Sequence, residues 1–257
     1  MASIADNNYP SNQECVMKIA VAGATGLIGA QLTALARKEG HDVVEIARST
    51  GFDLLAPDGL EEALAGAEAV VDVTSSIGLQ DAAPYFTTVA RNLGRAATAA
   101  GVRRSVVLSI VGVDQSPDYD YYAAKLAHEQ ATREAAPGAV VLRATQFHEF
   151  PGQMLRWNTQ DGVARIIDVP SQPVDSAEVA RLLLDLATGE VTADQDLAGP
   201  QVERLVDQVR RLVEHTGSDV TVEAVDAPPS MAGGSMLPGP GALLRGPAWG
   251  TWLAQQG

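Results

Sequence analysis

Cysteine is nearly absent from this 257-residue sequence, in which Cys15 is the only one. A single thiol cannot form an intrachain disulfide, and no group of cysteine and histidine has the spacing of a zinc site. We therefore predict no bound metal. Low cysteine usage is typical of proteins in a reducing compartment, so we expect the protein in the cytoplasm.

Positive charge is also scarce, with 18 Lys and Arg against 32 Asp and Glu and a formal net charge of −14. Such a chain is repelled by nucleic-acid phosphates and by anionic lipid headgroups, so we expect neither a nucleic acid nor a membrane as a partner. No apolar run reaches the about 18 residues of a membrane-spanning helix. Residues 1–16 lack the basic and apolar regions of a signal peptide. We expect them to form a flexible extension.

Aromatic residues make up only 5% of the chain, so Ala, Val and Leu must supply most of the core. Short apolar runs alternate with segments of helical periodicity, and these runs are continuous, as in parallel strands buried on both faces. We predict an α/β fold with a Rossmann-type, doubly wound parallel sheet over residues 17–150. A small C-terminal substrate lobe is expected over 151–257, with parts of it able to pack back onto the sheet. The apolar runs are 18–22, 43–47, 69–74, 105–110 and 139–143.

A glycine-rich turn joins the first apolar run to a helical segment. Gly23, Gly26 and Gly29 have the spacing G-x-x-G-x-x-G, in the strand-to-helix position of a dinucleotide-binding fingerprint. The first glycine allows the tight turn, the second lets the backbone approach a pyrophosphate, and the third permits close packing of helix on strand. The helix N-terminus adds free amides. The predicted cofactor contacts here are Gly23, Thr25, Gly26, Leu27, Ile28 and Gly29.

The end of the second apolar run indicates which dinucleotide is bound. An NAD site usually carries an acidic residue there, about 20 residues after the glycine motif. This chain has Arg48 and Ser49 instead. A guanidinium forms charge-assisted hydrogen bonds with a 2′-phosphate, so we predict NADP(H) as the cofactor and keep NAD(H) as an alternative.

Ser109, Tyr121 and Lys125 form a candidate catalytic set. Ser109 lies near the carboxyl end of an apolar run, where open α/β sheets place their sites. Tyr121 and Lys125 are four residues apart and therefore share one helix face. A lysine ammonium lowers the pKa of a neighbouring tyrosine, which is otherwise near 10 and poorly suited to acid–base work. We predict that Tyr121 transfers the proton and that Ser109 holds a carbonyl oxygen.

These motifs together resemble the short-chain dehydrogenase/reductase superfamily, in its atypical or extended form, and within it the NmrA-like NAD(P)H-binding proteins. The resemblance also rests on residues 52–54, 73–75, 108–112, 121–125 and 142–150. It implies that Asp53 contacts the adenine and that Lys125 holds the nicotinamide ribose. The further cofactor contacts it implies are Leu54, Thr74, Ser75, Thr145 and Phe147.

The chain departs from the resembled family in two places. The family's asparagine-containing turn is replaced by Thr-Ser-Ser at 74–76, and the C-terminal third has no motif that identifies a substrate. Gln146 and His148 follow a strand end, and we predict that they face the substrate. A structural role for His148 is an open alternative.

The leading functional prediction is an NADP(H)-dependent oxidoreductase. It would reduce a small carbonyl compound or oxidise an alcohol by hydride transfer from or to the cofactor. Many NmrA-like members lack the tyrosine and act as sensors, so binding of NADP(H) without turnover is one alternative. A dehydratase or epimerase on the same scaffold is another. The substrate, the direction of the reaction and the oligomeric state stay open.

Overall fold

A central parallel sheet organises the computed structural model, which describes residues 16–76 and 82–256. Seven strands among these residues lie in the order β12-β9-β5-β4-β3-β1-β2, and every neighbouring pair is parallel. This confirms the predicted Rossmann-type α/β fold. The strands are β1 (Lys18–Ala22), β2 (Asp42–Ile46), β3 (Ala69–Asp72), β4 (Arg104–Ile110), β5 (Ala139–Ala144), β9 (Gln195–Ala198) and β12 (Leu243–Leu244).

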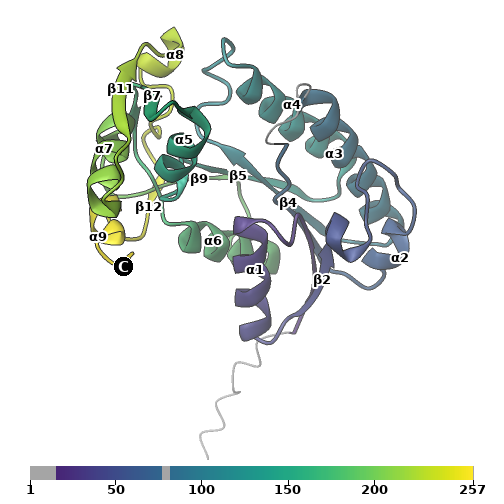
Figure 1. Cartoon of the computed structure of the whole chain (residues 1–257). Coiled ribbons are helices and arrows are strands. Elements are labelled where there is room, and N and C mark those ends of the chain that lie inside the picture. The colour runs from purple at the N-terminus through teal and green to yellow at the C-terminus, as the bar shows by residue number, and fades with distance from the viewer. Residues whose placement is uncertain (1–15, 77–81, 257) are drawn as a thin grey trace, which may run out of the picture.

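Helices cover both faces of the sheet (Figure 1). Helices α1 and α6 pack together on one face, and α2, α3 and α4 cover the other. Side chains of β1 alternate between these layers, with Val21 in the α1/α6 core and Ala20 in the α2/α3 core. Both faces are buried, which explains the continuous apolar runs. The helices are α1 (Leu27–Lys38), α2 (Leu60–Leu64), α3 (Ala82–Ala99), α4 (Asp120–Ala135), α5 (Phe150–Asn158), α6 (Ser176–Thr188), α7 (Leu205–Thr216), α8 (Pro229–Ala232) and α9 (Trp249–Leu253).

The chain reverses its direction across the sheet at β1, which lies between β3 and β2. The glycine turn follows β1, and residues Val73 to Ser75 follow β3, so both reach the same edge of the sheet. Open α/β sheets bind ligands at the carboxyl ends of their strands beside such a reversal. The fold therefore places the predicted cofactor residues where a ligand site is expected.

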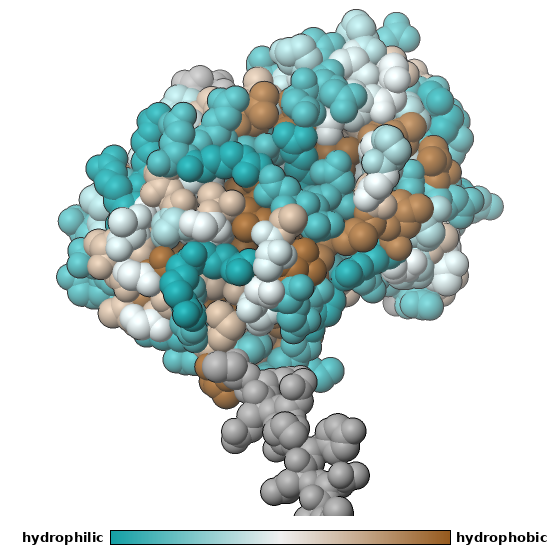
Figure 2. Space-filling model, turned by 180° about the vertical axis from the view of Figure 1, so that it is seen from behind, coloured by the Kyte–Doolittle hydropathy of each residue, from teal (hydrophilic) through white to brown (hydrophobic). Residues whose placement is uncertain are grey.

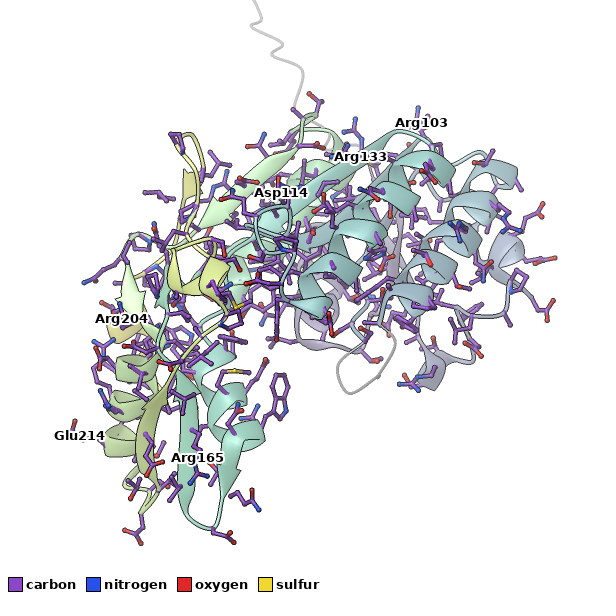
Figure 3. All side chains as sticks on the ribbon, turned by 90° about the horizontal axis from the view of Figure 1, so that it is seen from above. Arg103, Asp114, Arg133, Arg165, Arg204 and Glu214 are labelled. Carbon is purple, nitrogen blue, oxygen red and sulfur yellow. The ribbon has the colours of Figure 1, made fainter. Side chains whose placement is uncertain are left out.

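The C-terminal third is divided between the sheet and a lobe. Helix α6 and strands β9 and β12 join the main sheet, whereas α5 and α7 pack with β6 (Thr159–Gln160), β7 (Val163–Ile167) and β11 (Thr221–Val225). In Figure 3, Arg165, Arg204 and Glu214 mark the lobe, across the molecule from Arg103. A short pair of strands, β8 (Pro170–Ser171) and β10 (Glu203–Arg204), connects the two parts.

The lobe has its own apolar core, which reaches the start of α4. Ile166, Leu205 and Val209 from the lobe pack with Tyr122 of α4. The Pro- and Gly-rich segment over 227–247 contributes Met231 to this core, at 2% exposure. The first part of that segment is therefore packed into the lobe, whereas its later part carries β12, which pairs with β9 in the main sheet.

The face opposite to the view of Figure 1 carries both hydrophilic and apolar residues. Figure 2 shows the rear face, where apolar residues form bands between hydrophilic ones. Within the described residues, no helix is long and apolar enough to cross a membrane. The extension predicted over residues 1–16 lies outside the described part of the chain except for Val16.

Candidate functional site

The three glycines of the turn differ in what a side chain would meet. Gly23 has a φ of +83°, and a Cβ there would lie 3.0 Å from the carbonyl oxygen of Val73. A Cβ at Gly29 would lie 2.1 Å from the carbonyl oxygen of Gly23, so the helix packs directly on the turn. A Cβ at Gly26 would meet only that same oxygen, at 3.3 Å. The exposed side of the turn is therefore open at Gly26.

The N-terminus of α1 presents backbone amides at this opening. Gly26 is the N-cap and supplies no side-chain cap, so the first-turn amides need an outside acceptor. Thr25, Gly26 and Leu27 are exposed, whereas Ile28 and Gly29 are buried in the helix packing. These features fit a pyrophosphate, because free amides and the positive end of the helix dipole face open space.

Arg48 and Ser49 lie exposed in a short 3-10 helix, η1 (Arg48–Thr50), directly after β2. Arg48 forms no ion pair with any residue that the structure describes. The acidic residue nearest in sequence, Glu45, is instead paired with Arg37 at 2.7 Å. The guanidinium of Arg48 is thus available for an anionic ligand, while Glu45 is occupied.

Asp53 and Leu54 follow η1 and differ in exposure. Asp53 is exposed, and its carboxylate accepts a hydrogen bond from the amide of Leu55 at 3.0 Å. Leu54 is 7% exposed, and its carbonyl oxygen accepts from the side-chain amide of Asn92 at 2.9 Å. Leu54 therefore anchors the segment, whereas Asp53 is exposed.

Asp72, at the end of β3, organises the residues that follow it. Its Oδ1 accepts hydrogen bonds from the Thr74 amide at 2.9 Å and the Thr74 hydroxyl at 2.7 Å. Thr74 is 8% exposed, and Ser75 is exposed. Burial alone would raise the pKa of Asp72, but His128 and the Thr74 donors lower it to about 2. Asp72 is therefore an ionised carboxylate at neutral pH.

Tyr121 lies half-buried at the start of α4. Its ring packs edge-on against Phe86 of α3, with centroids 6.0 Å apart. Burial raises the pKa of the Tyr121 phenol, and the hydroxyl of Ser75 acts in the opposite direction. The structure thus brings Tyr121 and Ser75 together from two different elements.

Lys125 lies one turn after Tyr121 and is 4% exposed. Its Nζ donates to the carbonyl oxygen of Leu108 at 2.8 Å and to Nδ1 of His128 at 2.9 Å. The same Nζ stands 4.5 Å from the centroid of Phe86. Lys125 and Tyr121 therefore share Phe86 as a neighbour, and the two bonds of the ammonium go to Leu108 and His128.

Ser109 faces away from the lobe. Its side chain is 2% exposed, and its hydroxyl is buried without a hydrogen-bond partner in the described structure. The next residue, Ile110, packs with Tyr121 against the apolar core of the lobe. Because side chains alternate along a strand, Ser109 has the orientation of Ser105, which lies among residues of α3 and α4, and its hydroxyl is buried in that layer. A contact between Ser109 and a substrate carbonyl would require this region to rearrange.

The segment after β5 contains the four other residues predicted to contact the cofactor or the substrate, Thr145 to His148. The side chains of three of them form hydrogen bonds. The Thr145 hydroxyl donates to the carbonyl oxygen of Gln172 at 2.6 Å. The Gln146 amide donates to the Tyr122 hydroxyl at 3.1 Å. The remaining two are Phe147, half-buried, and His148, 1% exposed with its Nε2 3.2 Å from the carbonyl oxygen of Pro173.

A cavity of about 420 Å³ lies between the start of α1, α5 and α9. Leu27 and His148, predicted for cofactor and substrate, both line it, together with Trp249 and Trp252. The indole N–H of Trp249 donates to the carbonyl oxygen of His148 at 3.0 Å. The C-terminal helix therefore holds the His148 segment at the wall of this cavity.

The fold and the glycine turn define a dinucleotide-binding α/β protein. A family model described as NAD(P)H-binding matches residues 23–190, more than half of the chain. The chain therefore belongs to this NAD(P)H-binding family, and its cofactor is of the NAD(P)H type. A search of curated protein sequences finds no match.

Solved structures share the fold at low sequence identity. A dTDP-4-dehydrorhamnose reductase from Bacillus anthracis, in complex with NADP, is 16% identical with a TM-score of 0.74, covering 93% of this chain and 98% of that one. A UDP-N-acetylglucosamine 4-epimerase from Bacillus cereus is 15% identical with a TM-score of 0.64, covering 82% and 88%. An NAD-dependent NDP-hexosamine 5,6-dehydratase is 16% identical with a TM-score of 0.66, covering 83% and 86%.

Three residues of the site were not predicted from the sequence. Phe86, fully buried, packs against Tyr121, Lys125 and His128. His128 lies three residues after Lys125, and Asp72 interrupts the apolar run 69–74 at the residue where β3 ends. An acidic residue that ends a buried strand was the one available signal, because a buried carboxylate needs partners.

Proposed function

We propose that the protein is an NADP(H)-dependent oxidoreductase that interconverts a small carbonyl compound and its alcohol. The observation that carries this proposal is the half-buried phenol of Tyr121, which lies beside Ser75 and one helical turn before Lys125. This group lies at the carboxyl ends of β3 and β4, the edge at which the glycine turn opens. A proton donor and a dinucleotide site on one edge are the two parts that carbonyl reduction requires.

Each residue of the group has a separate task in the proposed reaction. NADPH supplies the hydride when it is bound. Tyr121 donates its phenolic proton to the carbonyl oxygen, and Ser75 donates a hydrogen bond that stabilises the phenolate left behind. Burial raises the pKa of Tyr121, and the Ser75 hydroxyl lowers it. We assign to the ammonium of Lys125, one helical turn further along α4, the positive charge that favours the phenolate.

Tyr121→Phe tests this assignment directly. The variant retains the ring that packs on Phe86 and loses only the proton donor, so NADPH affinity is retained and turnover falls by about 10²–10⁴-fold. A panel of quinones, aldehydes and ketones, followed by NADPH absorbance, provides the substrate. Tyr119→Phe is the matched control, because Tyr119 is 41% exposed. Turnover by Tyr121→Phe at the parent rate would refute the mechanism.

Tyr122 is unsuitable as a control, although it neighbours Tyr121 in sequence. Its hydroxyl is buried and accepts the hydrogen bond of Gln146. Tyr122→Phe would leave the Gln146 amide unpaired in the core, so it would change the packing of the site as well as one hydroxyl.

Binding of NADP(H) without turnover is the second candidate function. The Ser109 hydroxyl favours it, because this hydroxyl is buried and therefore does not reach a substrate in this conformation. For this sensor function we expect tight NADPH binding, no NADPH consumption across the panel, and the same result for Tyr121→Phe. Consumption of NADPH by the wild type alone would exclude it.

A further inference from the structure

Asp72, His128 and Lys125 form a buried polar chain that joins β3 to α4. Nζ of Lys125 lies 2.9 Å from Nδ1 of His128, and Nε2 of His128 lies 2.9 Å from Oδ2 of Asp72. All three residues are buried: Asp72 and Lys125 are each 4% exposed, and His128 is 0% exposed. Phe86 of α3 stacks on the His128 ring with centroids 4.7 Å apart and so covers the three polar side chains on that side.

The chemistry of the two ends determines how the histidine is protonated. An ammonium group can only donate, and a carboxylate can only accept. Nδ1 of His128 must therefore carry a lone pair, and Nε2 must carry the proton that Asp72 accepts. Lys125 uses a second N–H on the carbonyl oxygen of Leu108. One N–H of the ammonium is then left for a further partner.

We propose that Asp72 and His128 are positioning residues that hold Lys125 as an ammonium ion and fix the direction of its remaining N–H. The inference rests on the proposed function, in which that N–H serves the cofactor ribose and the phenolate of Tyr121. Neither Asp72 nor His128 touches the reacting atoms. They act through Lys125 alone.

The charges around Lys125 support this role. Burial lowers the pKa of Lys125 to about 8, while the negative charges of Asp72 and Glu129 raise it. Glu129, on the same helix, is already engaged by Arg143 through bonds of 2.9 and 2.8 Å. Burial and the neighbouring ammonium lower the pKa of His128, so the ring is neutral at neutral pH. Asp72 is therefore the carboxylate that offsets the buried charge of Lys125.

Lysine NMR of the wild-type protein tests the proposal without any cofactor. The chain has only three lysines, so a protein labelled at lysine Cε gives three signals, and Lys125→Arg identifies the one of interest. We expect the pKa of Lys125 to lie near 8, well below the ordinary lysine value of about 10.4. Histidine ¹⁵N spectra should show His128 neutral with its proton on Nε2. A proton on Nδ1, or a Lys125 that titrates at the ordinary lysine pKa, would overturn the proposal.

Two sets of variants separate charge from geometry. Asp72→Asn keeps the shape and removes the charge, so the pKa of Lys125 should fall further, by about one unit or more. His128→Leu removes both bonds and should weaken NADPH binding about tenfold, whereas His128→Gln offers a carbonyl to Lys125 and an amide to Asp72 and should recover most of that loss. His215→Leu is the matched control, since His215 is exposed and bonds only the Gln256 carbonyl.

The outcomes distinguish this inference from the proposed function. An unchanged Lys125 titration in Asp72→Asn refutes the positioning role. Equal NADPH affinities of His128→Leu and wild type also refute it if Lys125→Ala has lost affinity. If Asp72→Asn does not fold, the wild-type titration and the His128 pair decide. If the titrations come out as expected but Lys125→Ala binds NADPH as well as wild type, the positioning of the ammonium stands and the task given to Lys125 is wrong.

Discussion

Alanine at Gly29 and alanine at Gly26 should have different effects, one on folding and one on cofactor binding. A Cβ at Gly29 would lie 2.1 Å from the carbonyl oxygen of Gly23 and 2.8 Å from the Cα of Ala24. Both are backbone atoms, so no side-chain rotation relieves the clash, and α1 must move off the turn. Overpacking typically costs about 1–3 kcal/mol. We expect Gly29→Ala at the upper end of that range.

Gly26→Ala should instead fold normally and lose the cofactor. Its Cβ would meet only the Gly23 carbonyl oxygen, at 3.3 Å, and its φ of −77° suits alanine. The loss of a favoured N-cap residue and the reduced freedom of the unfolded chain oppose each other, each by about 1 kcal/mol or less. The added methyl group occupies the opening over the turn. We expect NADPH affinity to fall at least about tenfold, or about 1.4 kcal/mol.

Urea unfolding and NADPH fluorescence titration of both variants provide the assay. Gly239→Ala is the control, because a Cβ there would have no neighbour within 4 Å. The reasoning is refuted if Gly29→Ala is as stable as wild type, or if folded Gly26→Ala binds NADPH with wild-type affinity.

Two further predictions concern buried polar groups. The low pKa of Asp72 contributes stability that is present above about pH 4 and lost as the pH falls to about 2. The unfolding free energies of wild type and Asp72→Asn should therefore converge by about 2 kcal/mol across that interval. A constant difference between the two in urea melts would contradict this. Trp249→Phe removes the donor to the buried His148 carbonyl and should lower the unfolding free energy by about 1–3 kcal/mol. Trp157→Phe is the control and should change it little, because the Trp157 side chain is half-exposed. Equal urea midpoints for these two variants would contradict that role.

Local signals in the sequence predicted much of the fold. The glycine spacing specifies a turn between one strand and one helix, and Asp175 followed by Gly189 predicts the cap and the end of α6. The structure confirms both ends: the Asp175 carboxylate accepts from the Ala177 amide, and Gly189 ends the helix in the left-handed conformation. Each of these features depends on residues within one or two helical turns, so a single sequence is enough to find it.

Contacts between distant segments were not predictable in this way. Asp72 and His128 are 56 residues apart, and only the packing of β3 against α4 brings them together. Ser109 and Ile110 face opposite sides of β4. Because the strand is apolar on both faces, the sequence shows no alternation that would indicate which side each of these side chains faces. Strands β9 and β12 have only four and two residues, so they have too little periodicity to reveal their return to the sheet.

Isothermal titration with NADPH and with NADH tests the central claim most directly. Arg48 is exposed, has no ion pair among the described residues, and stands where an acidic residue would favour NAD. We predict that wild type binds NADPH more tightly than NADH, and that Arg48→Ala loses about 1.5–3 kcal/mol toward NADPH only, the usual size of a hydrogen bond to a charged group. Equal affinity of wild type for the two cofactors, or an unchanged NADPH affinity in Arg48→Ala, would contradict the account.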